Sequence, residues 1–124
     1  MKQALLVFLG SGIGGSLRYL IGKYLNTNTN EIPWGTLIVN ILGSLLIGIV
    51  LGLALKNNTL SQNQTLLLAT GFCGGFTTFS AFANEGLQLL KNGQTSLFFL
   101  YVIGSITLGL LCVWLGYIFI EKSH

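Results

Sequence analysis

Residues 71–82 read GFCGGFTTFSAF and lie within an apolar segment long enough to cross a membrane. The middle of this segment is poor in helix formers, because the glycine pair 74–75 weakens helix propagation and the threonine pair 77–78 loses side-chain freedom in a helix. In hydrocarbon, a backbone interruption is tolerated only where it is buried in protein or lines a polar cavity. The stretch therefore predicts a membrane helix broken near its middle, whose freed carbonyls can hold a cation and whose freed N–H groups can face an anion. A kinked helix that uses glycine for close packing is the alternative interpretation.

The composition of the whole chain is that of an all-α membrane protein. Hydrophobic residues make up 52% of the 124 residues and charged residues only 7%, whereas soluble domains carry roughly 25% charged residues. The chain also has 17 glycines, about twice the usual share, which favours helices that approach closely through small residues. The net charge of +3 comes from few groups and forms no basic stripe, so nucleic acid is not an expected partner. We expect residues 1–124 to form a single integral membrane domain in the lipid bilayer.

Outward from the quoted stretch, apolar runs predict four transmembrane helices. They are expected at residues 3–24, 32–55, 62–75 continuing at 79–90, and 95–120. The 24 residues of the second run contain no charge, and at about 1.5 Å per residue they span roughly 36 Å, enough for a ~30 Å hydrocarbon core. Either Ser61 or Asn63 is expected to cap the start of the third helix.

Four spans would place both chain termini on one side of the membrane. The cations then divide evenly, with Lys2, Lys56 and Lys122 on the side of the termini and Arg18, Lys23 and Lys91 on the other. The excess of positive charge that normally fixes the orientation of a membrane protein is therefore absent. This balance fits a chain that inserts in both orientations and pairs as an antiparallel two-fold dimer. It fits equally well a chain whose first helix alone fixes one orientation, or one in which Arg18 lies too deep to count.

Asn40 is a carboxamide at mid-membrane depth in the second run, and Thr36 lies one turn before it. An amide is costly against lipid, so Asn40 should face protein or a polar path. Its two N–H donors suit a partly dehydrated anion. A structural hydrogen bond between helices is an equally good interpretation.

Phenylalanine recurs every third residue through the third run, as Phe76, Phe79 and Phe82. Such a stripe ordinarily belongs to a core or to a lipid-facing surface. However, the edge of an aromatic ring is positive, and an edge that points into a narrow pathway can stabilise an anion. Nearby hydroxyls are supplied by Thr77, Thr78 and Ser80.

In the fourth run, Tyr101, Ser105 and Gly109 share one helix face, which is either a hydroxyl track or a packing seam. Arg18 and Glu85 are the charges set nearest the apolar spans, where each needs a partner, water or an interface. Arg18 either anchors the first helix at the headgroups or attracts anions at a pore mouth. Glu85 is either a local partner or a pore-mouth residue.

The sequence lacks the residue patterns of catalysis. It contains no Walker loop, no paired carboxylates, no nucleophile with a base and no metal-ligand cluster. We therefore expect that the protein is not an enzyme.

Three segments in order resemble the Fluc (CrcB) family of fluoride channels. The quoted stretch resembles the signature of that family, residues 12–18 (GIGGSLR) resemble its first helix, and residues 33–43 (PWGTLIVNILG) resemble its second. Chain length and the four-helix layout agree as well. Two positions depart from the family pattern: Gly109 stands where some members have a hydroxyl residue, and Phe76 stands where leucine is common.

The resemblance implies a dual-topology antiparallel homodimer with two pores, which passes fluoride down its gradient out of the cytoplasm across the bacterial inner membrane and so reduces fluoride toxicity. It implies a structural sodium ion (Na+) at the dimer centre, bound by the backbone carbonyls of Gly74 and Thr77. The implied fluoride path comprises Asn40, Phe79, Phe82, Tyr101 and Ser105. The implied supporting or pore-mouth residues are Arg18, Thr36, Thr78, Ser80 and Glu85.

Two other functions compete with this one. A proton-coupled small multidrug transporter also has four short helices and dual topology, but it needs a carboxylate deep in the first helix, and residues 3–24 contain no Asp or Glu. A noncatalytic subunit that stabilises a larger membrane complex is the second alternative. Purified protein that forms a stable dimer and conducts on its own would exclude it.

Overall fold

The computed structural model describes residues 1–56 and 58–123, and this part of the chain is helical without strands. The helices are α1 (Lys2–Leu25), α2 (Trp34–Leu55), α3 (Gln62–Thr65), η1 (Leu66–Cys73), α4 (Gly74–Phe76), α5 (Phe79–Lys91) and α6 (Thr95–Lys122). α3, η1, α4 and α5 together make one span, so the described residues contain four helices long and apolar enough to cross a membrane. The expected four-span, all-helical fold is confirmed, and the chain is a multi-pass membrane protein.

The third span starts with a well-formed cap. Ser61, rather than Asn63, is the N-cap: its hydroxyl accepts the N–H of Gln64 at 3.1 Å, and the Gln64 side chain accepts the N–H of Ser61 at 2.9 Å. This reciprocal capping box satisfies two backbone donors that a helix start otherwise leaves unpaired. Beyond it, the backbone of η1 winds as a π-helix, a rare form that often accompanies functional sites.

The break in the third span falls on two threonines. Thr77 (φ −87°, ψ 161°) and Thr78 (φ −151°, ψ 126°) are extended, and helix resumes at Phe79. The Thr78 hydroxyl accepts the N–H of Ala81 at 3.2 Å and so caps α5. The observed break agrees with the discontinuity expected after residue 75.

Glycine allows the helices to pack backbone against backbone. A Cβ added at Gly14 of α1 would lie 2.8 Å from the backbone nitrogen of Phe76, and one added at Gly75 of α4 would lie 2.7 Å from the Cα of Ser11. Between α2 and α6, a Cβ at Gly116 would lie 2.5 Å from the carbonyl oxygen of Leu45. Close approach through small residues is the usual means by which membrane helices gain van der Waals contact.

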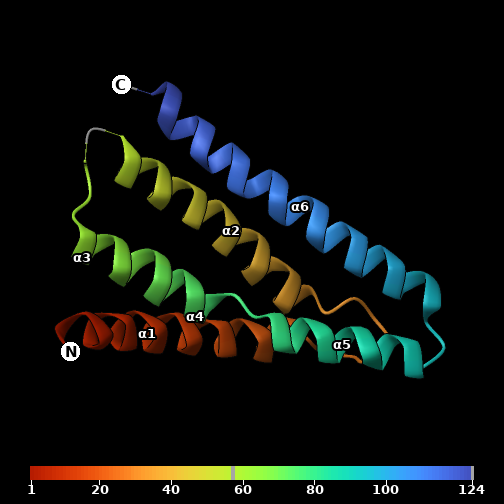
Figure 1. Cartoon of the computed structure of the whole chain (residues 1–124). Coiled ribbons are helices and arrows are strands. Elements are labelled where there is room, and N and C mark those ends of the chain that lie inside the picture. Colours follow the sequence, from red (N-terminus) through yellow and green to blue (C-terminus); the bar gives the residue numbers. More distant parts are fainter. Residues whose placement is uncertain (57, 124) are drawn as a thin grey trace.

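α2 and α6 lie side by side and run in the same direction, while the third span lies beside α1 in its first half (Figure 1). Both termini lie at the same end of the bundle, as four spans require (Figure 1). Large apolar side chains cover the outside of the single chain, among them Leu110 and Trp114 of α6. Lipid is the natural solvent for such a surface.

Candidate functional site

Asn40 of α2 holds the break of the third span. Its Oδ1 accepts the N–H of Thr78 at 2.8 Å, and its Nδ2 donates to the carbonyl of the same residue at 3.1 Å. One side chain thereby satisfies both backbone polar groups of Thr78, a residue outside the helices on either side of the break, and such groups need a partner inside a membrane. The structural bond between helices that the sequence allowed for Asn40 is therefore present. Nδ2 keeps a second hydrogen for another acceptor.

The break releases carbonyl groups from helical hydrogen bonding. In a continuous helix the Gly74 carbonyl would accept the N–H of Thr78, but that N–H binds Asn40. The Thr77 carbonyl would likewise accept the N–H of Ala81, which binds the Thr78 hydroxyl instead. Gly74 is exposed and Thr77 half-buried, so both carbonyls lie near the surface of the single chain.

Arg18 binds the end of the first half of the broken helix. Its Nε donates to the Gly75 carbonyl at 3.0 Å, and the guanidinium is half-buried between α1 and α4. A cation at a helix C-terminus is stabilised by the helix dipole as well as by the hydrogen bond. Neither expected place for Arg18, the headgroups or a pore mouth, includes this contact with the break.

A cavity of about 420 Å³ opens beside the break, between α2, the third span and α6. It is lined by Asn40, Gly43, Ser44, Ile47, Cys73, Gly74, Thr77, Thr78, Phe79, Phe82, Ser105, Ile106 and Gly109. The lining thus includes seven residues predicted for the sodium site, the fluoride path or its support: Asn40, Gly74, Thr77, Thr78, Phe79, Phe82 and Ser105.

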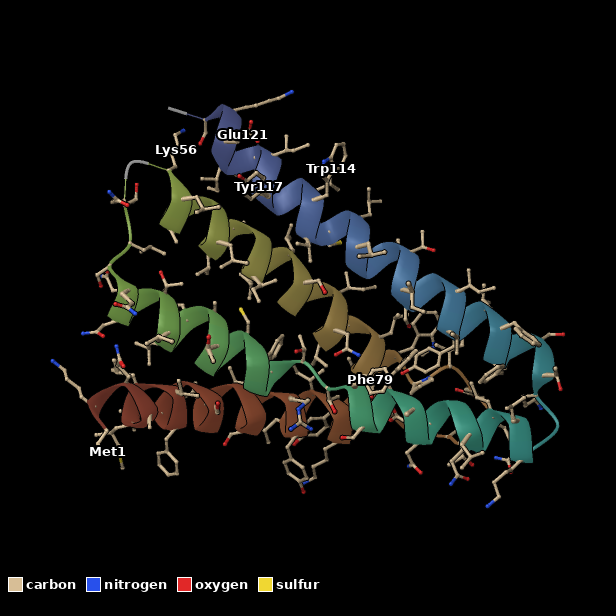
Figure 2. The ribbon with its side chains drawn as sticks, in the orientation of Figure 1. Met1, Lys56, Phe79, Trp114, Tyr117 and Glu121 are labelled. Carbon is tan, nitrogen blue, oxygen red and sulfur yellow. The ribbon has the colours of Figure 1, made fainter. Side chains whose placement is uncertain are left out.

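Aromatic rings form one wall of the cavity. Phe79 stands at the start of α5, on the side toward α2 (Figure 2). Its ring centroid lies 5.9 Å from that of Phe82, which lies 5.1 Å from that of Tyr101. Phe76, the first member of the sequence stripe, lies before the break and is buried against Phe72 with the two rings stacked at 5.5 Å. The break therefore separates a packing phenylalanine from the two at the cavity.

Two hydroxyls from different helices line the cavity. The Oγ atom of Ser105 on α6 is buried and has no hydrogen-bond partner among the described residues. Ser44 lies on α2, one turn after Asn40, and its hydroxyl donates to the Asn40 carbonyl at 2.7 Å. Ser44 is not among the residues predicted from the sequence, although its spacing of four residues from Asn40 on a continuous helix was a usable signal.

Tyr101 and Glu85 belong to a polar cluster on the other side of Phe82. The Tyr101 hydroxyl is 3.5 Å from one Glu85 carboxylate oxygen, and the Asn26 amide donates to the other at 3.1 Å. The same amide donates to the hydroxyl of buried Thr36 at 3.1 Å. Glu85 is thus a local hydrogen-bond partner, one of the two roles that the sequence left open.

Asn26 is the centre of this cluster, and sequence reasoning missed it. Its Oδ1 accepts the N–H groups of Gly35 at 2.8 Å and Thr36 at 3.3 Å, which satisfies the start of α2. Asn26 lies in a polar segment where asparagine is ordinary, so no local signal marks it. Ser80, by contrast, is exposed, and its hydroxyl lies 3.4 Å from that of Thr78.

The sequence of residues 5–117 matches the family described as "CrcB-like protein, Camphor Resistance (CrcB)". The chain belongs to this family. The CrcB-like relatives include a "Fluoride-specific ion channel FluC" of Phocaeicola vulgatus, 52% identical over 94% of this chain and 96% of its own length. Proteins of the same name from Flavobacterium psychrophilum and Thermus thermophilus are 44% and 46% identical, covering 98% and 94% of this chain and 99% and 92% of their own lengths.

Membership in the CrcB-like family agrees with the resemblance carried by the three sequence segments. The match spans all four membrane helices, because residues 5–117 run from α1 into α6. Every described residue that lines the cavity lies inside this matched range.

Proposed function

We propose that this chain is a fluoride-selective passive channel of the bacterial inner membrane, which lets fluoride leave the cytoplasm and so limits its toxicity. The observation that carries the proposal is the cavity beside the break. An amide from α2, two phenylalanine rings from α5 and a hydroxyl from α6 meet there, as Asn40, Phe79, Phe82 and Ser105. The names of the CrcB-like relatives support fluoride as the ion.

The physical problem for such a channel is dehydration. Fluoride is small and strongly hydrated, so a narrow path must replace its water with donors at several sites. The second Nδ2 hydrogen of Asn40 and the unpartnered hydroxyl of Ser105 are two such donors. The positive ring edges of Phe79 and Phe82 add a weaker attraction, and Tyr101 continues the path beyond Phe82. Chloride is excluded mainly because it is larger.

The lining also explains why an anion would move on. None of the described residues that line the cavity carries a charge. An anion there meets dipoles and ring edges rather than a fixed cation that would hold it, and conduction requires binding that is weak enough to release. Arg18, Thr36, Ser80 and Glu85 support the path from outside the cavity, and Thr78, which lines the cavity, caps α5 at the break.

The proposed channel is an antiparallel dual-topology homodimer with two pores. Phe79 is 79% exposed in the single chain although it lines the cavity, and Gly74 beside it is exposed too. A phenylalanine that has to face a narrow path needs a second surface opposite it. Another copy of the chain supplies that surface under two-fold symmetry, with the even division of cations permitting both orientations.

A structural sodium ion is part of the proposal, and the residues present fit it. The carbonyls of Gly74 and Thr77 are free of helical hydrogen bonds because the break redirects two N–H groups. Neutral oxygens of this kind suit a hard cation, and two from one chain would become four across a two-fold axis. When bound, the ion would supply positive charge that joins the broken helices of the two copies.

The proposed function is tested with purified protein in liposomes. Vesicles loaded with fluoride are diluted into fluoride-free buffer and followed with a fluoride electrode, while chloride-loaded vesicles are run in parallel. We expect rapid fluoride release and retained chloride. Silence from well-folded dimeric protein would favour the accessory-subunit function, and equal release of both ions would contradict selectivity.

A further inference from the structure

The cavity contains a hydroxyl with no assigned role, that of Ser44. Ser44 is half-buried on α2 and lines the cavity with Ser105 and Gly109 of α6. Gly109 has no side chain, and a Cβ built there would lie 3.6 Å from the Ser44 Oγ and within 4 Å of no other described atom beyond the adjoining α6 backbone. The Ser44 hydroxyl therefore lies beside Gly109, where α6 has no polar side chain to offer to the cavity.

The α6 wall carries an unpartnered hydroxyl one helical turn from Gly109. The Oγ atom of Ser105, one turn before Gly109, is buried and makes no hydrogen bond within the described chain. Leaving a buried hydroxyl unsatisfied costs about 1–3 kcal/mol, so such a group ordinarily has a ligand or water. Two hydroxyls and a vacant glycine position thus border one small volume beside Asn40.

The single hydrogen bond of Ser44 can be exchanged at little cost. Its hydroxyl donates to the Asn40 carbonyl at 2.7 Å, four residues earlier on α2. Residues 40 and 44 both lie inside the continuous helix Trp34–Leu55, so that carbonyl also accepts the Ser44 backbone N–H. When the hydroxyl turns away, the carbonyl keeps its helical bond and no buried acceptor is left unsatisfied. The Ser44 hydroxyl can therefore rotate between the Asn40 carbonyl and an anion in the cavity.

We infer that Ser44 is an anion-contacting residue, which donates its hydroxyl to a small, strongly hydrated anion at the level of Gly109. The inference rests on the proposed function and deepens it, because it assigns one polar step of the path to α2 instead of α6. An O–H donor is well matched to fluoride, since a bond to a charged acceptor is stronger than the neutral intrahelical bond that it replaces.

The test moves the hydroxyl from one helix to the other. Fluoride efflux from liposomes is compared for wild type, Ser44→Ala, and the double variants Ser44→Ala/Gly109→Ser and Ser44→Ala/Gly109→Ala. Losing one donor to a charged ion should lower the efflux rate by about tenfold in Ser44→Ala. The serine at 109 should restore most of that rate, because truncation at 44 leaves room for it. The alanine at 109 fills the same space without a donor and should not restore it.

The rescue separates an anion contact from a structural bond. In every variant the Asn40 carbonyl keeps the backbone N–H of residue 44, so loss of a purely structural hydroxyl bond would appear as a lower unfolding temperature and not as slower efflux that Gly109→Ser restores. Unfolding temperature and gel-filtration profile in detergent are measured for every variant, and all are expected to match wild type. A conducting wild type whose Ser44→Ala variant keeps its rate, or is rescued equally by both double variants, overturns this inference alone. A wild type that releases no fluoride overturns the proposed function and this inference with it.

Discussion

The two halves of the third span pack in opposite ways. Before the break, the helix lies on α1 with backbone against backbone, so that neither Gly14 nor Gly75 has room for a Cβ. After the break, α5 meets α6 through large side chains, with the Phe82 ring tilted against that of Tyr101 and Leu89 almost fully buried. The cavity opens where the first kind of packing gives way to the second.

The difference assigns separate tasks to the two halves. Close glycine packing leaves no adjustable side chains, so the first half forms a rigid base that fixes where the helix ends. Side-chain packing around the second half leaves room that polar groups and ring edges can line. A membrane site for a small ion needs both, because donors must be held in place without filling the path.

The largest expected effect comes from adding one methyl group to the glycine-packed half. Gly14→Ala places a Cβ against the backbone of Phe72 and Phe76, which cannot shift without moving the helix. Overpacking of this kind costs about 1–3 kcal/mol, and we expect a clear drop in unfolding temperature and in the yield of folded protein.

Gly12→Ala is the matched control, because Gly12 lies on the same helix as Gly14 but a Cβ added there would meet no described atom within 4 Å. It should unfold at or slightly above the wild-type temperature, since alanine favours helix over glycine. Equal behaviour of the two variants would show that close packing does not set the rigidity of this half.

The second variant removes the side chain that bonds the break between the two halves. Asn40→Ala leaves the N–H and the carbonyl of Thr78 without the partners that now hold the break. Each unsatisfied group costs about 1–3 kcal/mol, so both unfolding temperature and fluoride efflux should fall. Asn63→Ala, at the exposed start of the same span, removes an equal amide and should change neither. An Asn40→Ala protein as stable as wild type would show that the extended backbone at the break does not depend on the hydrogen bonds from Asn40.

A smaller effect is expected at the end of the first half. Arg18→Gln removes the bond to the Gly75 carbonyl and the charge beside the helix end, together worth about 1–2 kcal/mol. Lys23→Gln removes another cation of α1, one that makes no hydrogen bond to the break. We expect it to lower the free energy of unfolding by less than Arg18→Gln does. Thermal unfolding in detergent compares the two, and an equal shift would reduce Arg18 to a general surface charge.

Much of the fold follows from local properties of the chain. Uncharged runs predict the spans because only closed helical hydrogen bonding survives in lipid, and glycine beside threonine predicts the break because both disfavour helix. The sequence left open whether Ser61 or Asn63 caps α3. The structure shows Ser61 as the cap, with reciprocal hydrogen bonds to Gln64. The π-helical winding of η1, which packs against α1, has no comparable local signature in the sequence.

The site was predictable only where one residue type has few other uses. An amide at mid-membrane depth marked Asn40, whereas Asn26 lay among loop asparagines and gains its position from contacts with α2 and α5. The spacing of Phe76, Phe79 and Phe82 suggested a single stripe, but an extended pair of residues interrupts the helix between the first and the second. Distances along a sequence predict a shared face only while the helix continues.

Fluoride efflux from liposomes containing Phe79→Ile or Phe82→Ile protein tests whether the ion passes through the cavity after the break. Isoleucine keeps apolar bulk but has no positive ring edge, so each change should slow efflux by about two- to tenfold while the protein stays folded. Phe8→Ile is the matched control, because Phe8 is 71% exposed on α1 and does not line the cavity. Slow efflux in both cavity variants beside wild-type efflux in Phe8→Ile would support the account. Unchanged efflux in Phe79→Ile and Phe82→Ile would contradict it.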